Sequence, residues 1–417
     1  MSLCEINFDG IVGPSHNYAG LSFGNVASMR HAGAVSQPRA AALQGIDKMR
    51  ANLALGLAQG IFLPHPRPHR AWLAELGIDA EHAEPALFAA ATSASAMWAA
   101  NAATVSPAPD TADGRCHLTV ANLRTMPHRS HEWPATLAQL GVAFGSNAFA
   151  VHAPVPPAFG DEGAANHMRL AGAHGEPGVE LFVYGVSGGA FPARQHVEAS
   201  TAIARLHRLD PERVIFAAQS EEAIAAGAFH NDVVAVANQR VLFAHEKAFA
   251  DRSGVISKCE RLFPELQLVE VPASEVPLAD AISSYLFNAQ LVSLLDGTPV
   301  FVSDPLSGNT HDKTAFEETP VAEIVSNSGG GIGDKGYQGT DLATPRKKPK
   351  GGELSKRDKE NNAAVSALRA PIERVVAHFK NWTILHTDYR RPYSTYRETY
   401  DAARGLFFFS INWEPFE

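Results

Sequence analysis

The sequence has little cysteine and no long hydrophobic run, and each absence excludes a class of protein. Its three cysteines, Cys4, Cys116 and Cys259, lie too far apart for a disulfide framework or for a metal site of closely spaced cysteines. No apolar run reaches the roughly 18 residues that cross a membrane, and the N-terminus lacks the basic and apolar regions of a secretory signal. We therefore expect reduced thiols and a cytoplasmic protein.

The composition of the chain is that of a globular protein, and its length indicates more than one structural unit. The 417 residues are 45% hydrophobic and 19% charged, and this length predicts two or three units or one large repeat-built domain. Residues 1–304 hold 19 basic against 29 acidic side chains, whereas residues 305–417 hold 16 against 15. The shift predicts a different ancestry or partner for the tail, because basic segments suit polyanions.

Up to about residue 290, short β-branched runs alternate with Ala/Leu-rich stretches, which is the pattern of an α/β fold. The predicted strands are 214–217, 232–236 and 241–244, and the predicted helices include Pro38–Leu55 and Val197–Leu206. Because only a short connection separates the last two strands, they are expected to pair antiparallel, so the sheet cannot be purely parallel.

The character of the chain changes after Phe301. A Gly triplet at 329–331 and a basic run at Arg346–Lys350 lead into a predicted amphipathic helix from about Glu360 to Trp382. We place the boundary between the two parts near 292–304.

Three stretches of the first part are candidates for a functional site. Phe8–Asn25 is rich in Gly and polar residues but matches neither a Walker A loop nor a strand–GxGxxG–helix unit, which leaves a plain surface loop as the alternative. Gly160–His167 sets adjacent carboxylates between small residues, and Phe229–Asp232 sets a His and a carboxylate before an apolar strand. Such a pair can act as general base and cation anchor, although composition alone favours a structural role for each motif.

Together these stretches resemble N-succinylarginine dihydrolase, a family of the guanidino-group-modifying (pentein) superfamily. The resemblance runs from Glu5 to about Leu295 and includes the stretches Trp98–Ala103, His117–Leu123, His128–Ser130, Phe191–Gln195 and Ser283–Asn288. It implies an α/β fold, a five-bladed α/β propeller whose C-terminal part is missing here. It also implies an enzyme of arginine catabolism that hydrolyses N2-succinylarginine to N2-succinylornithine, ammonia and carbon dioxide.

The resemblance further implies which residues form the site. Two members of a Cys-His-Glu triad are Glu162 and His230. Substrate contacts are implied at Ala19, Gly20, Leu21, Ser22, Phe23, Gly24, Asn25, Val26, Ala27, Ser28, Asn101, His128, Arg129, Arg194 and Asp232. These roles suit the chemistry, because Asp232 can grip a planar guanidinium and the two arginines can hold the carboxylates of a succinyl group.

The nucleophile of the triad is absent. In the family, the Cys lies in the last part of the fold after an Asn-Gly-Gly-Gly-like stretch, which Ser326–Gly331 echoes superficially, but no Cys follows Cys259. Cys116 and Cys259 occupy positions where the family has no catalytic group. We expect impaired or absent turnover, because a triad that loses one member usually loses nearly all its catalysis. No cofactor or metal is implied for this part, and the oligomeric state stays open, a homodimer being one option.

The tail resembles the C-terminal part of a DDE-type insertion-sequence transposase, through Val302–Phe316, Gly333–Gly339 and the segment with Ile372–Arg374. The resemblance implies a partial RNase H-like fold, in which three carboxylates hold two divalent ions for phosphodiester chemistry. It makes Asp334, at a strand end, the second acid and Glu373, on a helix, the third.

In the family, the first acid belongs to an upstream strand, which we expect to be missing here. Asp296 is the alternative candidate for this first acid. A lone pair of carboxylates would hold Mg²⁺ weakly. The basic run Arg346–Lys350 is either a solvated loop or a weak, sequence-independent DNA contact.

The sequence therefore predicts a fusion of a dihydrolase-like part, residues 1–295, to a transposase-like part, residues 296–417. The leading hypothesis is a dihydrolase that has lost its nucleophile. The alternatives are DNA binding by the transposase remnant and binding of succinylarginine without catalysis.

Overall fold

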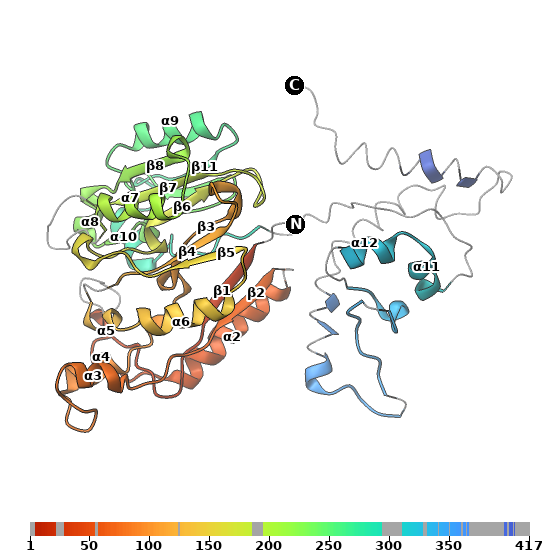
Figure 1. Cartoon of the computed structure of the whole chain (residues 1–417), viewed down its shortest axis with the longest axis horizontal. Helices are drawn as coiled ribbons and strands as arrows, with labels where there is room; N and C mark the ends of the chain where they lie inside the picture. The colour runs from red at the N-terminus through yellow and green to blue at the C-terminus, as the bar shows by residue number, and fades with distance from the viewer. Residues whose placement is uncertain are drawn as a thin grey trace. The chain divides into compact units, whose positions relative to one another are not determined.

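The computed structural model describes two units of the chain, which we treat separately (Figure 1). The first unit contains Met1–Asp47 and Gln59–Ser293, and the second contains Lys48–Ala58 and Leu294–Glu417. The described residues are 5–21, 29–54, 57–123, 126–185, 195–293, 311–327, 332–340, 342–349, 351–359, 362–363, 365–366, 396–397, 400–402 and 404.

Among the described residues, the first unit forms three three-stranded sheets of one topology and one two-stranded sheet (Figure 1). In each three-stranded sheet the middle strand pairs antiparallel with the strand before it and parallel with the strand after it. The strands of the three-stranded sheets are β3 (Ala103–Ser106), β4 (Cys116–Val120) and β5 (Phe149–His152); β6 (His167–Leu170), β7 (Val179–Tyr184) and β8 (Val214–Ala218); β9 (Ala235–Asn238), β10 (Val241–His245) and β11 (Gln267–Val271). The two-stranded sheet consists of β1 (Ile6–Gly10) and β2 (Ala58–Phe62).

A helix connects the two parallel strands of each three-stranded sheet, as parallel pairing requires. These connecting helices are α6 (Trp133–Ala143), α7 (Val197–Leu206) and α9 (Arg252–Leu262). Helix α6 packs on β4 and β5, α7 packs on β7 and β8, and α9 packs on β8 of the neighbouring sheet. The other helices before Ser293 are α2 (Pro38–Ala54), α3 (Arg70–Glu75), α4 (Pro85–Ala91), α5 (Pro127–Ser130), α8 (Glu221–Ala226) and α10 (Leu278–Ser284).

A short 3₁₀ turn precedes the first strand of each three-stranded sheet. These turns are η2 (Ala99–Asn101), η5 (Ala164–Asn166) and η7 (Asn231–Val233), and η5 lies against both of the others. The first two turns have the same sequence, Ala-Ala-Asn. The three sheets are therefore copies of one turn–β–β–α–β unit.

Most of the local predictions agree with these elements. The α/β class, helix α7, strands β8 and β10 and the antiparallel β9–β10 hairpin are confirmed, and α2 reaches Ala54 at the edge of the described residues. The predicted strand 232–236 is wrong in its first half, because Asp232 lies in η7 and β9 begins at Ala235. The Asn231 side chain donates to the Ala235 carbonyl at 3.3 Å, a local bond that competes with extended backbone.

The largest apolar cluster lies between the second and third of these sheets. Leu181 of β7, Leu242 of β10 and Cys259 of α9 are fully buried in it. Because side chains alternate along a strand, Phe182 points to the other face of β7 and packs with Ile203 of α7. The second sheet is therefore covered by apolar residues on both faces.

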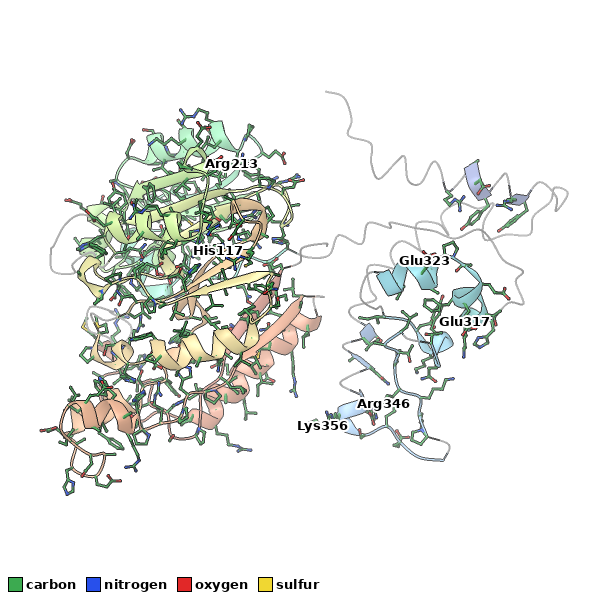
Figure 2. All side chains as sticks on the ribbon, in the orientation of Figure 1. His117, Arg213, Glu317, Glu323, Arg346 and Lys356 are labelled. Atoms are coloured by element: carbon green, nitrogen blue, oxygen red, sulfur yellow. The ribbon has the colours of Figure 1, made fainter. Side chains whose placement is uncertain are left out.

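A polar cluster joins the first of these sheets to the end of α7. His207 is fully buried and shares hydrogen bonds of 2.8 Å with Thr119 Oγ1 and Ser106 Oγ. His117 of β4, labelled in Figure 2, shares a 2.9 Å bond with Asp113. Burial lowers the pKa of His207 to about 2, so this imidazole is neutral at physiological pH. Satisfied polar groups of this kind fix one arrangement of the packed elements.

The two ends of the first unit meet at strand β9. The Asn238 side chain donates to Glu5 Oε1 at 3.2 Å and to the Leu291 carbonyl at 3.0 Å. The Ser293 backbone donates to Glu5 Oε2 at 3.1 Å. The segment that follows α10 is thus tied to the residue that precedes β1.

The described part of the second unit consists mainly of short elements. They are α11 (Asp312–Glu318), α12 (Val321–Asn327) and η8 (Lys335–Tyr337), with an isolated bridge between Ile332 and Ala343. The predicted strand before Asp334 is therefore only a bridge, and Asp334 caps η8 by accepting the Gly336 N–H at 2.7 Å. The RNase H-like fold stays a prediction, and the predicted helix to Trp382 lies largely outside the described residues.

No helix in the described part of the chain is long and apolar enough to span a membrane.

Replacement of Leu181 by Ala is expected to destabilise the first unit strongly, because it leaves a cavity in the core beside β7. The free energy of unfolding should fall by roughly 2–5 kcal/mol, measured by urea denaturation followed by circular dichroism. Val142→Ala is the matched control on the surface of α6, where Val142 is 87% exposed. The control should change stability by less than about 0.5 kcal/mol, and equal losses in the two variants would contradict the core described here.

Candidate functional site

The predicted triad residues lie beside the three 3₁₀ turns. Glu162 stands just before η5, His230 precedes η7, and Asp232 lies within η7. The backbone of Asn101 ends η2. Because η5 touches both η2 and η7, residues from distant parts of the sequence gather at one end of the three sheets.

Glu162 is held by backbone and side-chain hydrogen bonds. Its backbone exchanges two bonds with Asn122, at 2.7 and 2.8 Å, and its Oε1 accepts the Thr104 hydroxyl at 2.5 Å. The residue is 1% exposed, and burial raises the pKa of the carboxyl to about 8 against the effect of the Thr104 bond. A carboxyl with this pKa carries its proton at neutral pH and can donate it.

Arg129 and Asp232 form a pair of opposite charges. Burial lowers the pKa of Arg129, whereas the carboxylates of Asp161 and Asp232 oppose that shift. Burial also raises the pKa of Asp232 to about 7, and Arg129 opposes it. The Arg129 Nε meets no acceptor in the described part of the chain. The arrangement offers a guanidinium and carboxyl groups that interact electrostatically, which suits a ligand that itself carries both charges.

His128 and Arg129 are presented by the single turn of α5, which begins at Pro127. Proline suits the first position of a helix, because its missing N–H would have no helical acceptor there. His128 is buried, and Arg129 is half-buried. Both residues were predicted from the sequence, whereas Asp161, whose carboxylate acts on Arg129, was not.

A buried amide network supports the triad residues, and it was not predicted from the sequence. Gln195 Oε1 accepts from the Gly163 N–H at 3.3 Å and from the Asn166 side chain at 3.0 Å. Asn166 Oδ1 accepts the Asn231 N–H at 2.9 Å. The network joins the residue after Glu162 to the residue after His230. The sequence signal that could have indicated this network is the Ala-Ala-Asn that occurs in both η2 and η5.

The N-terminal contact segment is described only as far as Leu21. The Ala19 N–H donates to Asn17 Oδ1 at 3.1 Å and to Ser36 Oγ at 3.2 Å. Gly20 has a φ of +70°, and a Cβ there would lie 2.2 Å from the Ala32 Cα, so only glycine fits. The predicted contacts Ser22–Ser28 and Arg194, and the side chain of Asn101, lie outside the described residues.

A buried carboxylate anchors the segments next to α5. Glu132 accepts from the Ser95 hydroxyl at 2.8 Å and shares a 2.9 Å bond with His65, and Arg67 donates to the same carboxylate. Burial alone would raise its pKa, but His65 and Arg67 hold the pKa of Glu132 at about 2. This carboxylate is therefore ionised at all physiological pH values.

Comparison with known proteins shows the family of the chain. Residues 2–326 match the sequence model of succinylarginine dihydrolase. The chain belongs to the succinylarginine dihydrolase family. The N-succinylarginine dihydrolase of Sphingopyxis alaskensis is 66% identical over 325 residues, covering 78% of each chain. That of Novosphingobium aromaticivorans is 65% identical over 302 residues, covering 71% of this chain and 72% of the relative.

The second resemblance is also confirmed. Residues 282–406 match a DDE superfamily endonuclease, so the two matches overlap between residues 282 and 326. Among solved structures, the N-terminal domain of ArgZ, a cyanobacterial arginine dihydrolase, is 18% identical with a TM-score of 0.43. That similarity covers 78% of this chain and 93% of ArgZ's N-terminal domain.

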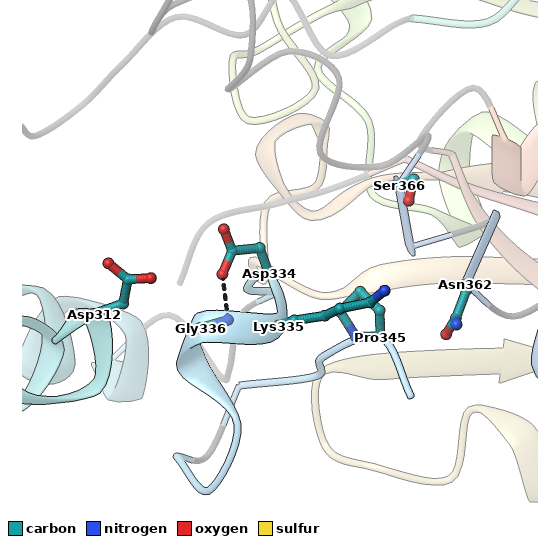
Figure 3. Close-up of a pocket in the computed structure, with 7 residues that line it drawn as sticks. All are labelled: Asp312, Asp334, Lys335, Gly336, Pro345, Asn362 and Ser366. Carbon is teal, nitrogen blue, oxygen red and sulfur yellow. Dashed lines mark hydrogen bonds between the residues drawn. The ribbon is translucent and has the colours of Figure 1, made fainter. Parts of the chain in front are cut away.

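Two carboxylates of the transposase-like part lie close together beside a cavity of about 320 Å³ (Figure 3). A Cβ on Gly336 would lie 1.9 Å from an oxygen of Asp312 and 3.0 Å from one of Asp334. Asp334 was predicted from the sequence but Asp312 was not, and Glu373 lies outside the described residues. Within the described part of the chain, no group of three or more His, Cys, Asp or Glu is arranged to hold a metal ion.

The raised pKa of Glu162 in this dihydrolase-family fold predicts how its stability depends on pH. The folded state binds a proton that the unfolded state releases between the ordinary pKa of 4.5 and the folded value of about 8, so stability falls as pH rises through this window. Glu162→Gln should remove that loss and be more stable than the natural chain at pH 8 by roughly 1–3 kcal/mol.

Thermal unfolding of both proteins at pH 5 and pH 8 measures the difference. Glu221→Gln, at an exposed position of α8, is the control and should follow the natural chain at both pH values. A Glu162→Gln variant that loses stability at pH 8 would show that Glu162 is ionised in the folded protein.

Proposed function

We propose that the first unit binds N2-succinylarginine and does not hydrolyse it, because this member of the dihydrolase family lacks the nucleophile. The observation that carries the proposal is the electrostatic interaction of Arg129 with Asp161 and Asp232 at the end of the sheets where Glu162 and His230 also lie. Asp232 would grip the guanidinium of the substrate, and Arg129 would hold a succinyl carboxylate.

Family membership supplies the reaction that the complete site would perform. A thiolate attacks the guanidinium carbon, ammonia leaves, and water cleaves the covalent intermediate; a second round yields N2-succinylornithine, carbon dioxide and another ammonia. In this chain Glu162 would hold a proton at neutral pH and His230 would serve as base. Neither Glu162 nor His230 can form the covalent bond to the guanidinium carbon that the cysteine sulfur forms in the family.

The two described thiols support the loss of turnover. Cys116 is half-buried on β4 and Cys259 is fully buried on α9, and both are free. Burial raises the pKa of each thiol to about 11, so both are protonated at neutral pH, whereas nucleophilic attack needs a thiolate.

The proposal includes the propeller architecture. Three repeated sheets and a two-stranded fourth support an incomplete ring of repeated units, in which the 3₁₀ turns line the centre. A truncated ring leaves sheet edges exposed, and such edges favour association with other chains.

The binding proposal predicts a pH dependence of known sign. Guanidinium pairs with the ionised form of Asp232, whose pKa is raised to about 7, so affinity should fall roughly tenfold per pH unit below 7 and level off above it. Calorimetric titration of the natural chain with N2-succinylarginine from pH 5.5 to 8.5 measures this. Asp232→Asn should bind at least roughly tenfold more weakly, and pH-independent binding by the natural chain would contradict the role of Asp232.

Ammonia release tests the absence of turnover. The natural chain and a His230→Ala variant, each incubated with N2-succinylarginine, are expected to release the same background amount. Ammonia above that of His230→Ala would contradict the proposal. Cys116→Ser and Cys259→Ser would then identify the thiol responsible.

A second candidate function rests on the DDE endonuclease match of residues 282–406. The exposed basic residues Arg346, Lys347 and Lys348 lie within this match and supply positive charge, so we propose weak, sequence-independent contact with DNA phosphates. Retention of the chain on double-stranded DNA should fall steeply between 50 and 200 mM salt. Replacing the three residues by Ala should abolish retention, and unchanged retention would exclude this contact.

A further inference from the structure

We infer that the first unit has a second ligand site, which binds a small zwitterion carrying an ammonium and a carboxylate, such as an amino acid. The site is a cavity of about 410 Å³ lined by Pro109–Ala112 after β3, by the turn Pro177–Gly178 before β7, and by residues from Arg208 to Val214 around η6 (Pro211–Arg213). This volume lies within the range of small-molecule sites in proteins.

The cavity is separate from the predicted dihydrolase residues. Those residues stand before β3, β6 and β9, at the end of the sheets where the first strands begin. The cavity lies beyond the last residue of β3, Ser106, and at the start of β7, where Val179 pairs with Leu170 at the end of β6. The two sites therefore occupy opposite ends of the same strands.

Glu180 gives the cavity a buried carboxyl group, one of whose oxygens meets no N–H or hydroxyl donor in the described part of the chain. The residue is 1% exposed on β7, and one of its oxygens, Oε2, shares a 2.5 Å bond with His167. The other oxygen, Oε1, is buried and meets no hydrogen-bond donor in the described part of the chain. An ammonium that enters the cavity would donate to this oxygen and replace the proton that Glu180 otherwise shares with the Asp110 carboxyl.

Asp110 adds a second carboxyl group beside Glu180. Its carboxylate accepts the Gly178 N–H at 2.5 Å and is paired with Arg169. Burial raises the pKa of Glu180 and His167 opposes that shift, whereas the charge of Asp110 and a side-chain hydrogen bond between the two carboxyl groups add to it, so the pair shares a proton when no ligand is bound. Two carboxyl groups this close favour a cation between or beside them, because their mutual repulsion is relieved by an added positive charge.

The rim of the cavity carries two arginines beside Asp210, whose carboxylate accepts the Glu212 N–H at 3.0 Å. Arg213, labelled in Figure 2, donates to the carbonyls of Gly178 and Pro177, both at 2.8 Å, and so fixes the turn. Arg208 is 59% exposed in its side chain, and its NH1 lies 3.6 Å from Asp113, a contact that is worth little at the surface. A ligand carboxylate at the rim would meet both guanidinium groups.

The backbone of Arg208 supports a functional role for its side chain. It follows α7 with a φ of +56°, and the next residue donates from Leu209 N to the Ala204 carbonyl, the bond of a helix C-terminal cap. This position favours glycine, as the equivalent Gly227 after α8 illustrates. An arginine held in this conformation is strained, and strained residues concentrate at functional sites.

The test uses unbranched ω-amino acids from glycine to 6-aminohexanoate, with methylammonium and acetate as half-ligands, in ligand-observed NMR titrations of the full chain. At least one amino acid is expected to bind roughly tenfold or more tightly than either half-ligand, because it contacts both charges at once. Equal weak binding of amino acids and half-ligands would overturn the inference.

Two variants assign binding to this cavity. Glu180→Gln and Arg208→Gly should each weaken binding roughly tenfold or more. Arg208→Gly should also leave the thermal midpoint unchanged or higher, since glycine adopts this conformation without a Cβ penalty. If Glu180→Gln fails to fold, Arg208→Gly decides alone, and unchanged binding by it would overturn the inference.

Two controls complete the design. Arg205→Ala removes an exposed arginine from the last turn of the same helix and should bind as the natural chain does. Asp232→Asn should also leave amino-acid binding unchanged. Loss of binding in Asp232→Asn would place the ligand in the predicted dihydrolase site and overturn the second site, while leaving the proposed function intact.

Discussion

The arrangement of the first unit depends on the bond by which the Asn166 side chain accepts the backbone N–H of Asn231. Asn166 closes the turn before the second three-stranded sheet, and Asn231 opens the turn before the third, so one buried amide sets the distance between two repeated units. Gln195 holds Asn166 from the other side. Because both turns carry predicted triad residues at their starts, the same amide fixes the spacing of Glu162 and His230. A polar bond inside a protein has this effect because its failure would leave two buried groups unpaired.

Burial, more than any single neighbour, sets the chemistry of the candidate site. It raises the pKa of Glu162 to about 8 and that of Asp232 to about 7, although a hydroxyl and a guanidinium oppose these shifts. Glu132, a few residues from Arg129, is equally enclosed yet has a pKa of about 2, because His65 and Arg67 bond to it directly. The same residue type is thus a proton donor in one place and a permanent anion in the other. The Arg67 charge and the His65 bond beside Glu132 distinguish the two cases, because Glu162 has only the neutral Thr104 hydroxyl.

The sequence predicted the local elements and the features that belong to the family. Periodicity located α7 and β8 correctly, and the family resemblance selected Glu162, His230 and Asp232. Asp232 was placed in a strand because its neighbours are β-branched, whereas a side-chain bond of Asn231 turns the chain there. The pairing of Arg129 with Asp161 and Asp232 could not be read from the sequence, because it depends on how separate sheets pack. Gln195 was missed for the same reason, since its partners are Gly163 and Asn166 on another element.

The junction of Glu5 with Asn238 and Ser293 bears on how such a chain can arise. The two ends of the first unit meet at this point, because Glu5 accepts hydrogen bonds from Asn238 of β9 and from the Ser293 backbone. A change of sequence beyond Ser293 would leave the bonds between Glu5, Asn238 and Ser293 in place. The join where one family's match gives way to the other, between residues 282 and 326, includes this position. A chain that differs beyond Ser293 can therefore keep the bonds that close its first unit.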